Sequence, residues 1–131
     1  MRLGLTRRQA LRRVKPQPVR RRSRVDRWCV KRSAGGVSAV FSSRSARGRA
    51  RLVTSTAGNH RIRGVRRGVR VRRLRDRFPG ARRISGGVYR AGARSRRIFG
   101  TRAGRVRFVG VADRRLLADR RKLRRFLRLA N

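Results

Sequence analysis

Acidic residues are almost absent from this sequence. Only four of its 131 residues are Asp or Glu, whereas 43 are Lys or Arg, so the formal net charge is +39. The four acids are Asp26, Asp76, Asp113 and Asp119, and there is no Glu. Even if each acid formed an ion pair, most of the positive charge would still be solvated, screened by ions or matched by an external polyanion. This imbalance excludes most classes of enzyme.

Lysine is also scarce, since Lys15, Lys31 and Lys122 are the only lysines and every other basic residue is arginine. Arginine forms paired hydrogen bonds with phosphate or carboxylate, which lysine does not. A GC-rich coding sequence would also favour arginine over lysine, and a spurious reading frame would give a similar skew. GC bias does not explain the missing acids, because Asp codons are GC-rich too. The helix caps, hairpin turns and repeat described below argue against random translation.

Cysteine and histidine each occur once, which excludes most kinds of active site. Cys29 has no partner for an internal disulfide, and we expect a small buried residue in a strand. His60 is flanked by Asn and Arg, where we expect a solvated loop histidine. We expect the four Asp to cap helices or form local salt bridges rather than to pair as catalytic carboxylates. The sequence therefore predicts no enzyme, no metal site and no cofactor.

Long hydrophobic runs are absent. The basic start of the chain is not followed by an apolar stretch, so no signal peptide is predicted, and no run approaches the ~18 residues of a membrane span. The expected localisation is cytoplasmic by default, or exported if a longer precursor carries the signal. Hydrophobic residues make up 37% and aromatic residues 5% of the chain. Such values are typical of disorder, but the apolar residues are periodically spaced, which indicates a folded protein.

A pattern of glycine, apolar residue, helix and proline occurs twice. Gly4-Leu5-Thr6 aligns with Gly64-Val65-Arg66, 60 residues later. The first helix is predicted to begin at Thr6, because Thr6-Arg7-Arg8-Gln9 is a capping box. The second has an apolar stripe with helical spacing and is predicted to end at Pro79-Gly80.

Three strands are predicted after each helix, from short apolar runs bounded by turn residues. They are 25–30, 37–41 and 49–55 in the first unit, and 87–91, 96–101 and 105–111 in the second. Ala103-Gly104 is the expected hairpin turn between the last two strands. The sequence thus predicts an α+β protein. Two helix-plus-three-stranded-meander units, at 3–56 and 64–112, form an antiparallel sheet, and 57–63 links them.

The segment 113–131 is predicted to form a basic amphipathic helix. Asp113 is the expected N-cap, and Leu116, Leu123 and Leu127 lie on one stripe, surrounded by arginine. A helix of this kind can lie on an anionic membrane or pack on a sheet. Because two meanders need an element to cover one face, we favour packing on the sheet.

The repeated order of glycine, apolar residue, short helix, proline and meander resembles the tandem helix-plus-sheet units of β-lactamase-inhibitor-protein-like folds. It also resembles the small lipoprotein of the outer-membrane barrel-assembly machine. The similarity is carried by Gly4 to Leu11, by Trp28-Cys29-Val30 and by Gly64-Val65 through Phe78-Pro79, and covers about residues 3–112. It implies an exported, non-enzymatic protein that binds other proteins. The lipidation cysteine of the lipoprotein family is missing here, and the arginine content is foreign to both groups.

The arginines occur in every predicted element rather than on one face. A uniform coat predicts sequence-independent contact with phosphates or other dense anions, driven by counterion release. The aromatic residues fall on core-like positions, Tyr89 least clearly, so exposed stacking platforms for single strands are not expected. We expect the contacts to be made by arginines of loops and helix surfaces: Arg44, Arg47, Arg49, Arg61, Arg63, Arg66, Arg67, Arg121, Arg124 and Arg125.

Two functions of different classes follow from these patterns. The first is a non-enzymatic, sequence-nonspecific polyanion-binding protein, whose partner is a nucleic acid, ribosomal RNA included, or an anionic envelope polymer. The second is an exported protein-recognition or inhibitor-like module, the end of a longer precursor. It predicts binding through a shaped surface, with weak dependence on salt.

Overall fold

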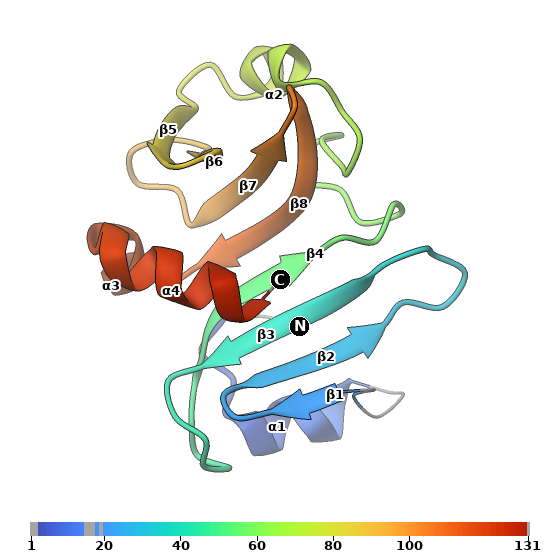
Figure 1. Ribbon diagram of the computed structural model, residues 1–131, viewed down its shortest axis with the longest axis vertical. Helices are drawn as coiled ribbons and strands as arrows, with labels where there is room; N and C mark the ends of the chain where they lie inside the picture. The colour runs from blue at the N-terminus through green and yellow to red at the C-terminus, as the bar shows by residue number, and fades with distance from the viewer. Residues whose placement is uncertain (1–2, 15–17, 19, 131) are drawn as a thin grey trace.

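An eight-stranded antiparallel sheet forms the centre of the structure. The computed structural model describes residues 3–14, 18 and 20–130. The strands follow the order β1-β2-β3-β4-β8-β7-β6-β5, so β1 and β5 are the edges and β4 pairs with β8 in the middle (Figure 1). The strands are β1 (Arg20–Arg22), β2 (Val25–Cys29), β3 (Gly36–Phe41), β4 (Ala50–Ser55), β5 (Arg82–Ser85), β6 (Val88–Arg90), β7 (Arg97–Arg102) and β8 (Arg105–Ala112).

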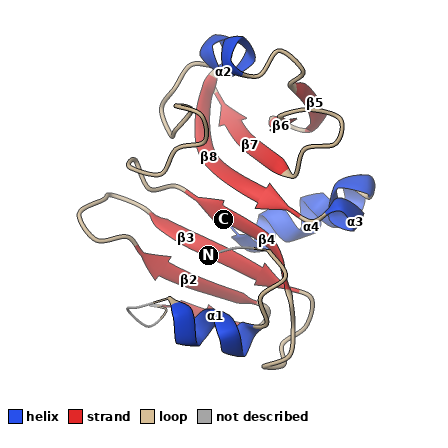
Figure 2. Cartoon of the chain, turned by 180° about the vertical axis from the view of Figure 1, so that it is seen from behind, coloured by secondary structure: helices blue, strands red, loops and turns tan. Residues whose placement is uncertain are grey.

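Helices cover both faces of this sheet. They are α1 (Arg7–Arg13), α2 (Val71–Arg77), α3 (Arg114–Ala118) and α4 (Arg120–Ala130). The two views show α4 in front of β3 and β4 and α1 behind the sheet (Figure 1, Figure 2). The α+β class, the antiparallel sheet and the C-terminal helical segment predicted from the sequence are confirmed.

The face under α4 has one continuous apolar core. Val40, Leu52 and Ile98 of the sheet are fully buried and belong to the same cluster as Leu123 and Leu127 of α4. Side chains of a strand alternate between faces, so the neighbours of these residues point to the opposite side. The apolar stripe of the C-terminal segment therefore packs on the sheet.

The opposite face has two smaller cores, one under each short helix. Trp28 and Phe41 pack with Ala10 of α1, whereas Phe99 packs with Leu74 of α2. Both predicted helices are present, each bringing few apolar side chains to the sheet. Arginine side chains therefore make up most of the surface of α1 and α2.

The capping box predicted at Thr6 is confirmed. The amide of Gln9 donates to Thr6 Oγ1 at 3.2 Å, and the amide of Thr6 donates to Gln9 Oε1 at 3.0 Å. Both groups would otherwise be unpaired at the helix N-terminus.

The predicted single helix over 113–131 is wrong in one respect, because it is interrupted at Asp119. Asp113 caps α3 as expected, accepting from the Leu116 amide at 3.0 Å. Asp119 has extended backbone angles, φ −114° and ψ 100°, and accepts from the Lys122 amide at 2.9 Å. A short acidic side chain that can accept from the backbone favours a cap over a helix interior. Asp119 thus ends α3 and begins α4.

All six predicted strands are present, but each helix is followed by four strands rather than three. The additional strands are β1 and β5, the two edges of the sheet. Their sequences are Arg-Arg-Arg and Arg-Arg-Ile-Ser. An edge strand pairs on one side only and needs no continuous apolar pattern, so a search for apolar runs does not find it.

Before α1 and before α2, a glycine and the residue after it make the same pair of backbone hydrogen bonds with a strand. The Gly4 amide donates to Ala50 O at 3.0 Å and the Ala50 amide donates to Leu5 O at 2.8 Å. Gly68-Val69 makes the same pair of bonds with Val106, both at 2.8 Å. Gly4 and Gly68 have φ of +83° and +89°, which suits glycine. Gly64-Val65, the pair predicted to correspond to Gly4-Leu5, lies in a separate turn in which Ile62 and Val65 bond to each other.

Candidate polyanion-binding surface

Three of the four acidic side chains bond to other groups of the fold. Asp26 is fully buried and accepts from Arg7 Nε at 2.9 Å and from Arg7 Nη2. Asp113 pairs with Arg51. Asp119 caps α4. The carboxylates of Asp26 and Asp113 are consequently not available to balance the outer arginines, whereas Asp119 is exposed.

Arg7 is the arginine that serves the fold rather than the surface. Its side chain is 8% exposed, and its Nη1 donates to Ser23 O at 2.8 Å and to Arg44 O at 2.9 Å. The guanidinium also lies 5.6 Å from the centre of the Phe41 ring. The sequence predicted a local salt bridge for Asp26, but gave no signal that Arg7 would be its buried partner.

All ten arginines predicted to bind polyanions are exposed. They form three groups rather than one patch. Arg44, Arg47 and Arg49 lie in or beside the β3–β4 loop, and Arg61, Arg63, Arg66 and Arg67 lie between β4 and α2. Arg121, Arg124 and Arg125 lie on α4, on the other face of the sheet from α1 (Figure 2).

None of these ten side chains bonds to a carboxylate in the part of the chain that the structure describes. Where they bond, the acceptor is neutral, and Arg63 instead lies over the Phe78 ring at 5.9 Å. The neutral contacts are Arg44 to Ser23 Oγ at 3.1 Å, Arg49 to Gly4 O at 3.3 Å, Arg67 to Ala34 O at 3.2 Å and Arg124 to Ser85 Oγ at 2.9 Å. Such contacts orient a guanidinium without neutralising its charge.

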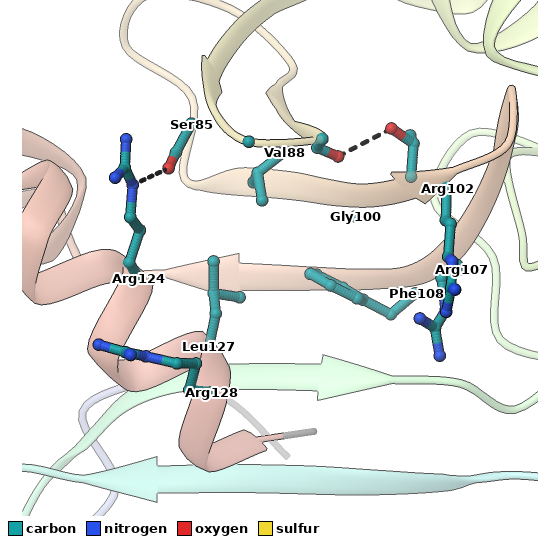
Figure 3. A pocket seen from close by; sticks show the side chains of 12 residues that line it. Ser85, Val88, Gly100, Arg102, Arg107, Phe108, Arg124, Leu127 and Arg128 are labelled. Carbon is teal, nitrogen blue, oxygen red and sulfur yellow. Dashed lines mark hydrogen bonds between the residues drawn. The ribbon is translucent and has the colours of Figure 1, made fainter.

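A groove of about 720 Å³ lies between α4 and strands β6 to β8 (Figure 3). Arg124 and Arg128 of α4 lie at one end, and Arg102 and Arg107 of the β7–β8 hairpin at the other. No carboxylate is among the described residues that line it. Of these four arginines, only Arg124 was among the predicted binding residues.

The floor of the groove between the two arginine pairs is uncharged. Val88, Phe108 and Leu127 lie there together with Gly100 (Figure 3). A Cβ on Gly100 would lie 1.9 Å from an atom of the Phe108 ring, so the ring rests against bare backbone. Gly86 and Gly87 line the same groove. Because these glycines have no side chains, the groove is not filled at their positions.

A second cavity, of about 610 Å³, lies beside α2 and has an acid in its lining. Arg70, Arg72, Arg73, Arg77 and Arg105 line it, but so does Asp76. An acid inside a ring of arginines weakens the attraction for an external anion. The four arginines of the groove under α4 and the five arginines and one Asp of this cavity give the same net charge, but only the groove has no acid among its described lining residues.

Arg90 has a lowered pKa because it is partly buried and lies near other guanidinium groups. Partial burial lowers the pKa of Arg90, and the neighbouring charges of Arg82 and Arg114 lower it further. Like charges close together disfavour the protonated form of each. A bound anion would relieve this repulsion.

The residues that could support other chemistry are separated. The structure as described holds no group of three or more His, Cys, Asp or Glu side chains able to bind a metal ion. Cys29 is exposed, which corrects the prediction of a buried residue: it lies at the end of β2, on the alternate position from buried Trp28. His60 Nδ1 lies 2.8 Å from Ser55 Oγ. Among the described helices, none has the length and apolar character needed to cross a membrane.

Comparison with known proteins gives no relatives. No protein family matches the sequence, and neither a curated protein nor a solved structure is significantly similar to the chain. The function must therefore be argued from the geometry and charge described above.

Proposed function

We propose that this protein is a non-enzymatic, sequence-nonspecific polyanion-binding protein that contacts nucleic acid through surface arginine. One observation carries the proposal. Asp26 and Asp113 pair with Arg7 and Arg51 and Asp119 caps α4, whereas the ten exposed arginines have no acidic partner among the described residues. A dense external anion supplies the missing negative charge, and the release of its counterions drives binding.

The distribution of the arginines supports contact without sequence reading. A protein that reads base sequence usually presents one basic face with a recognition element, opposite a neutral face. Here α4 carries arginines on one face of the sheet, and the β3–β4 loop packs beside α1 on the other, where Arg8 N donates to Ala46 O at 3.0 Å. This arrangement suits phosphate contacts at many orientations.

The test is the affinity for a random-sequence DNA duplex, measured by fluorescence anisotropy over a range of salt concentrations. If six to ten arginines contact phosphates at once, the affinity should fall about 10³- to 10⁵-fold between ~50 and ~200 mM salt. Inorganic polyphosphate and a folded acidic protein of matched charge serve as competitors. Equal binding to the acidic protein, or binding that is insensitive to salt, would refute the proposal and favour the protein-recognition function.

Arginine-to-glutamine variants test which part of the surface contacts the phosphates. Replacing Arg121, Arg124 and Arg125 by Gln should reduce the slope of log affinity against log salt by about 0.9 for each phosphate that the variant no longer neutralises. The triple variant of Arg44, Arg47 and Arg49 should behave similarly. The matched control replaces Arg8, Arg12 and Arg13 of α1 and should change the slope less.

We also propose that the two halves of the chain are copies of one helix-plus-four-strand unit. In each half a helix precedes four antiparallel strands, and the last strands of the halves, β4 and β8, pair with each other. The matching bonds of Gly4-Leu5 to Ala50 and of Gly68-Val69 to Val106 support this proposal. The offset between the two helices is 64 residues, from Arg7 to Val71.

A further inference from the structure

We propose that the groove between α4 and strands β6 to β8 binds a segment of single-stranded nucleic acid. In this arrangement phosphates lie at the two arginine pairs and a nucleotide base lies on the uncharged floor. The inference rests on the proposed function, and it adds a preference for unpaired over paired strands.

The first support is the charge of the groove. The side chains of Arg102, Arg107 and Arg128 have no hydrogen bond or ion pair with any other described residue, and that of Arg124 bonds only to the neutral Ser85 Oγ at 2.9 Å. Four arginines thus line one groove, with no carboxylate among its described lining residues. The charge favours an anionic ligand, and the paired donors of arginine match phosphate oxygens.

The second support is the arrangement of these charges. Two arginines come from α4 and two from the β7–β8 hairpin, so the cations form two pairs at opposite ends of the groove (Figure 3). A ligand with one anionic group would engage one pair only. A nucleic-acid strand has a phosphate on each side of every nucleotide, and so offers two anionic groups with an uncharged body between them.

The third support is the floor. Val88, Phe108 and Leu127 are nearly buried, with exposed fractions of 6%, 6% and 7%. They leave a shallow apolar surface beside the bare backbone of Gly86 and Gly100. Proteins that bind single strands combine a cationic groove with aromatic side chains on which any base can stack, and Phe108 is the aromatic residue of this floor. The uncharged floor therefore favours contact with a base of any identity.

The size of the groove favours a single strand over a duplex. Its volume of about 720 Å³ lies within the range of pockets that hold small ligands. A duplex keeps its bases stacked inside and offers only phosphates to this face, whereas an unpaired strand can turn a base toward the floor.

The test compares ligands that share phosphates but differ in bases. Labelled 12-nucleotide strands of deoxythymidine, of uridine and of an abasic backbone are titrated with the wild-type protein, alongside a duplex of the same length. We expect the deoxythymidine or uridine strand to bind about 10-fold tighter than the abasic strand, consistent with the measured effect of base contacts.

Two independent double variants locate the effect. Arg102→Gln with Arg107→Gln, and Arg124→Gln with Arg128→Gln, should each reduce the ratio of thymidine to abasic affinity to near one. Arg8→Gln with Arg12→Gln removes the same charge from α1, on the other face of the sheet, and should leave that ratio unchanged. Circular dichroism checks that each variant remains folded.

The outcomes separate this inference from the proposed function. If the wild-type protein binds all strands and the duplex equally with a steep salt dependence, polyanion binding stands and the groove inference is wrong. A base preference that persists in both groove variants also overturns it, because the base then lies elsewhere. If no nucleic acid binds at all, both proposals fail.

Discussion

The buried ion pair between Arg7 and Asp26 makes a sharp prediction about stability. Asp26 is fully buried and Arg7 nearly so, and the two side chains share two hydrogen bonds. Asp26→Ala would leave the guanidinium of Arg7 buried with only two carbonyl oxygens as acceptors. Removing one partner of a buried ion pair costs about 3–5 kcal/mol, because the remaining charge stays desolvated.

The corresponding thermal shift follows from the size of the chain. With an unfolding entropy of about 2.1 cal/mol/K per residue, each kcal/mol lowers the Tm of a protein of this size by about 3–4 °C. We therefore expect Asp26→Ala to lower the Tm by about 10–18 °C. Such a loss is a large share of the ~5–15 kcal/mol that stabilises a typical domain.

Urea titration is the suitable assay, since guanidinium chloride is a salt and would screen the charges under study. Trp28 is the only tryptophan and is buried, so its fluorescence reports unfolding. Asp76→Ala on the exposed surface of α2 is the matched control, and should change the free energy of unfolding by no more than about 0.5 kcal/mol. A double-mutant cycle with Arg7→Met should give a coupling energy of at least ~2 kcal/mol. Equal effects of Asp26→Ala and the control would refute the reasoning.

Two further predictions concern the sheet and the start of α3. Gly100→Ala should destabilise the protein by about 1–3 kcal/mol in the same urea titration, because the new methyl group would overlap the Phe108 ring. Gly92→Ala is the control and should have little effect, because a Cβ at Gly92 would have nothing within 4 Å. Burial raises the pKa of Asp113, but hydrogen bonds and Arg51 lower it more, so the net pKa is below its usual value of 3.8. A depressed pKa stabilises the fold above that value and the benefit is lost as pH falls through the folded pKa. Asp113→Asn should thus cost about 0.5–1 kcal/mol at pH 7, and its free energy of unfolding should approach that of the wild type as the pH falls through the lowered pKa of Asp113; a constant difference at all pH values would contradict this account.

The sequence was sufficient where local chemistry determines structure. The capping box at Thr6, the cap at Asp113 and the hairpin at Ala103-Gly104 follow from side chains within a few residues, and each is present. The six apolar strands follow from alternation, which depends on burial on one face or both.

Features that depend on partners distant in sequence could not be predicted in this way. Gly64-Val65 and Gly68-Val69 are the same dipeptide, and only pairing with Val106 distinguishes the second. Nothing near Arg7 distinguishes it from the exposed arginines around it, since its partner Asp26 is 19 residues away.

The same limit applies to the candidate site. The ten predicted arginines are exposed, as loop and helix-surface positions suggest, and their role stays a prediction. The groove needs Arg102 and Arg107 from a hairpin beside Arg124 and Arg128 from α4. Their convergence depends on how α4 packs on the sheet, which no local pattern encodes.

The two edges of the sheet have a consequence for self-association. An unpaired strand edge is a template to which another copy of the chain can add a strand. Here both outer strands are rich in arginine, with the sequences Arg-Arg-Arg in β1 and Arg-Arg-Ile-Ser in β5. Two approaching copies would bring like charges together at the β5 edge, so repulsion would oppose their pairing in dilute salt. An anion that neutralises this edge removes that protection, and the protein should then be most prone to aggregate when its positive charge is nearly balanced.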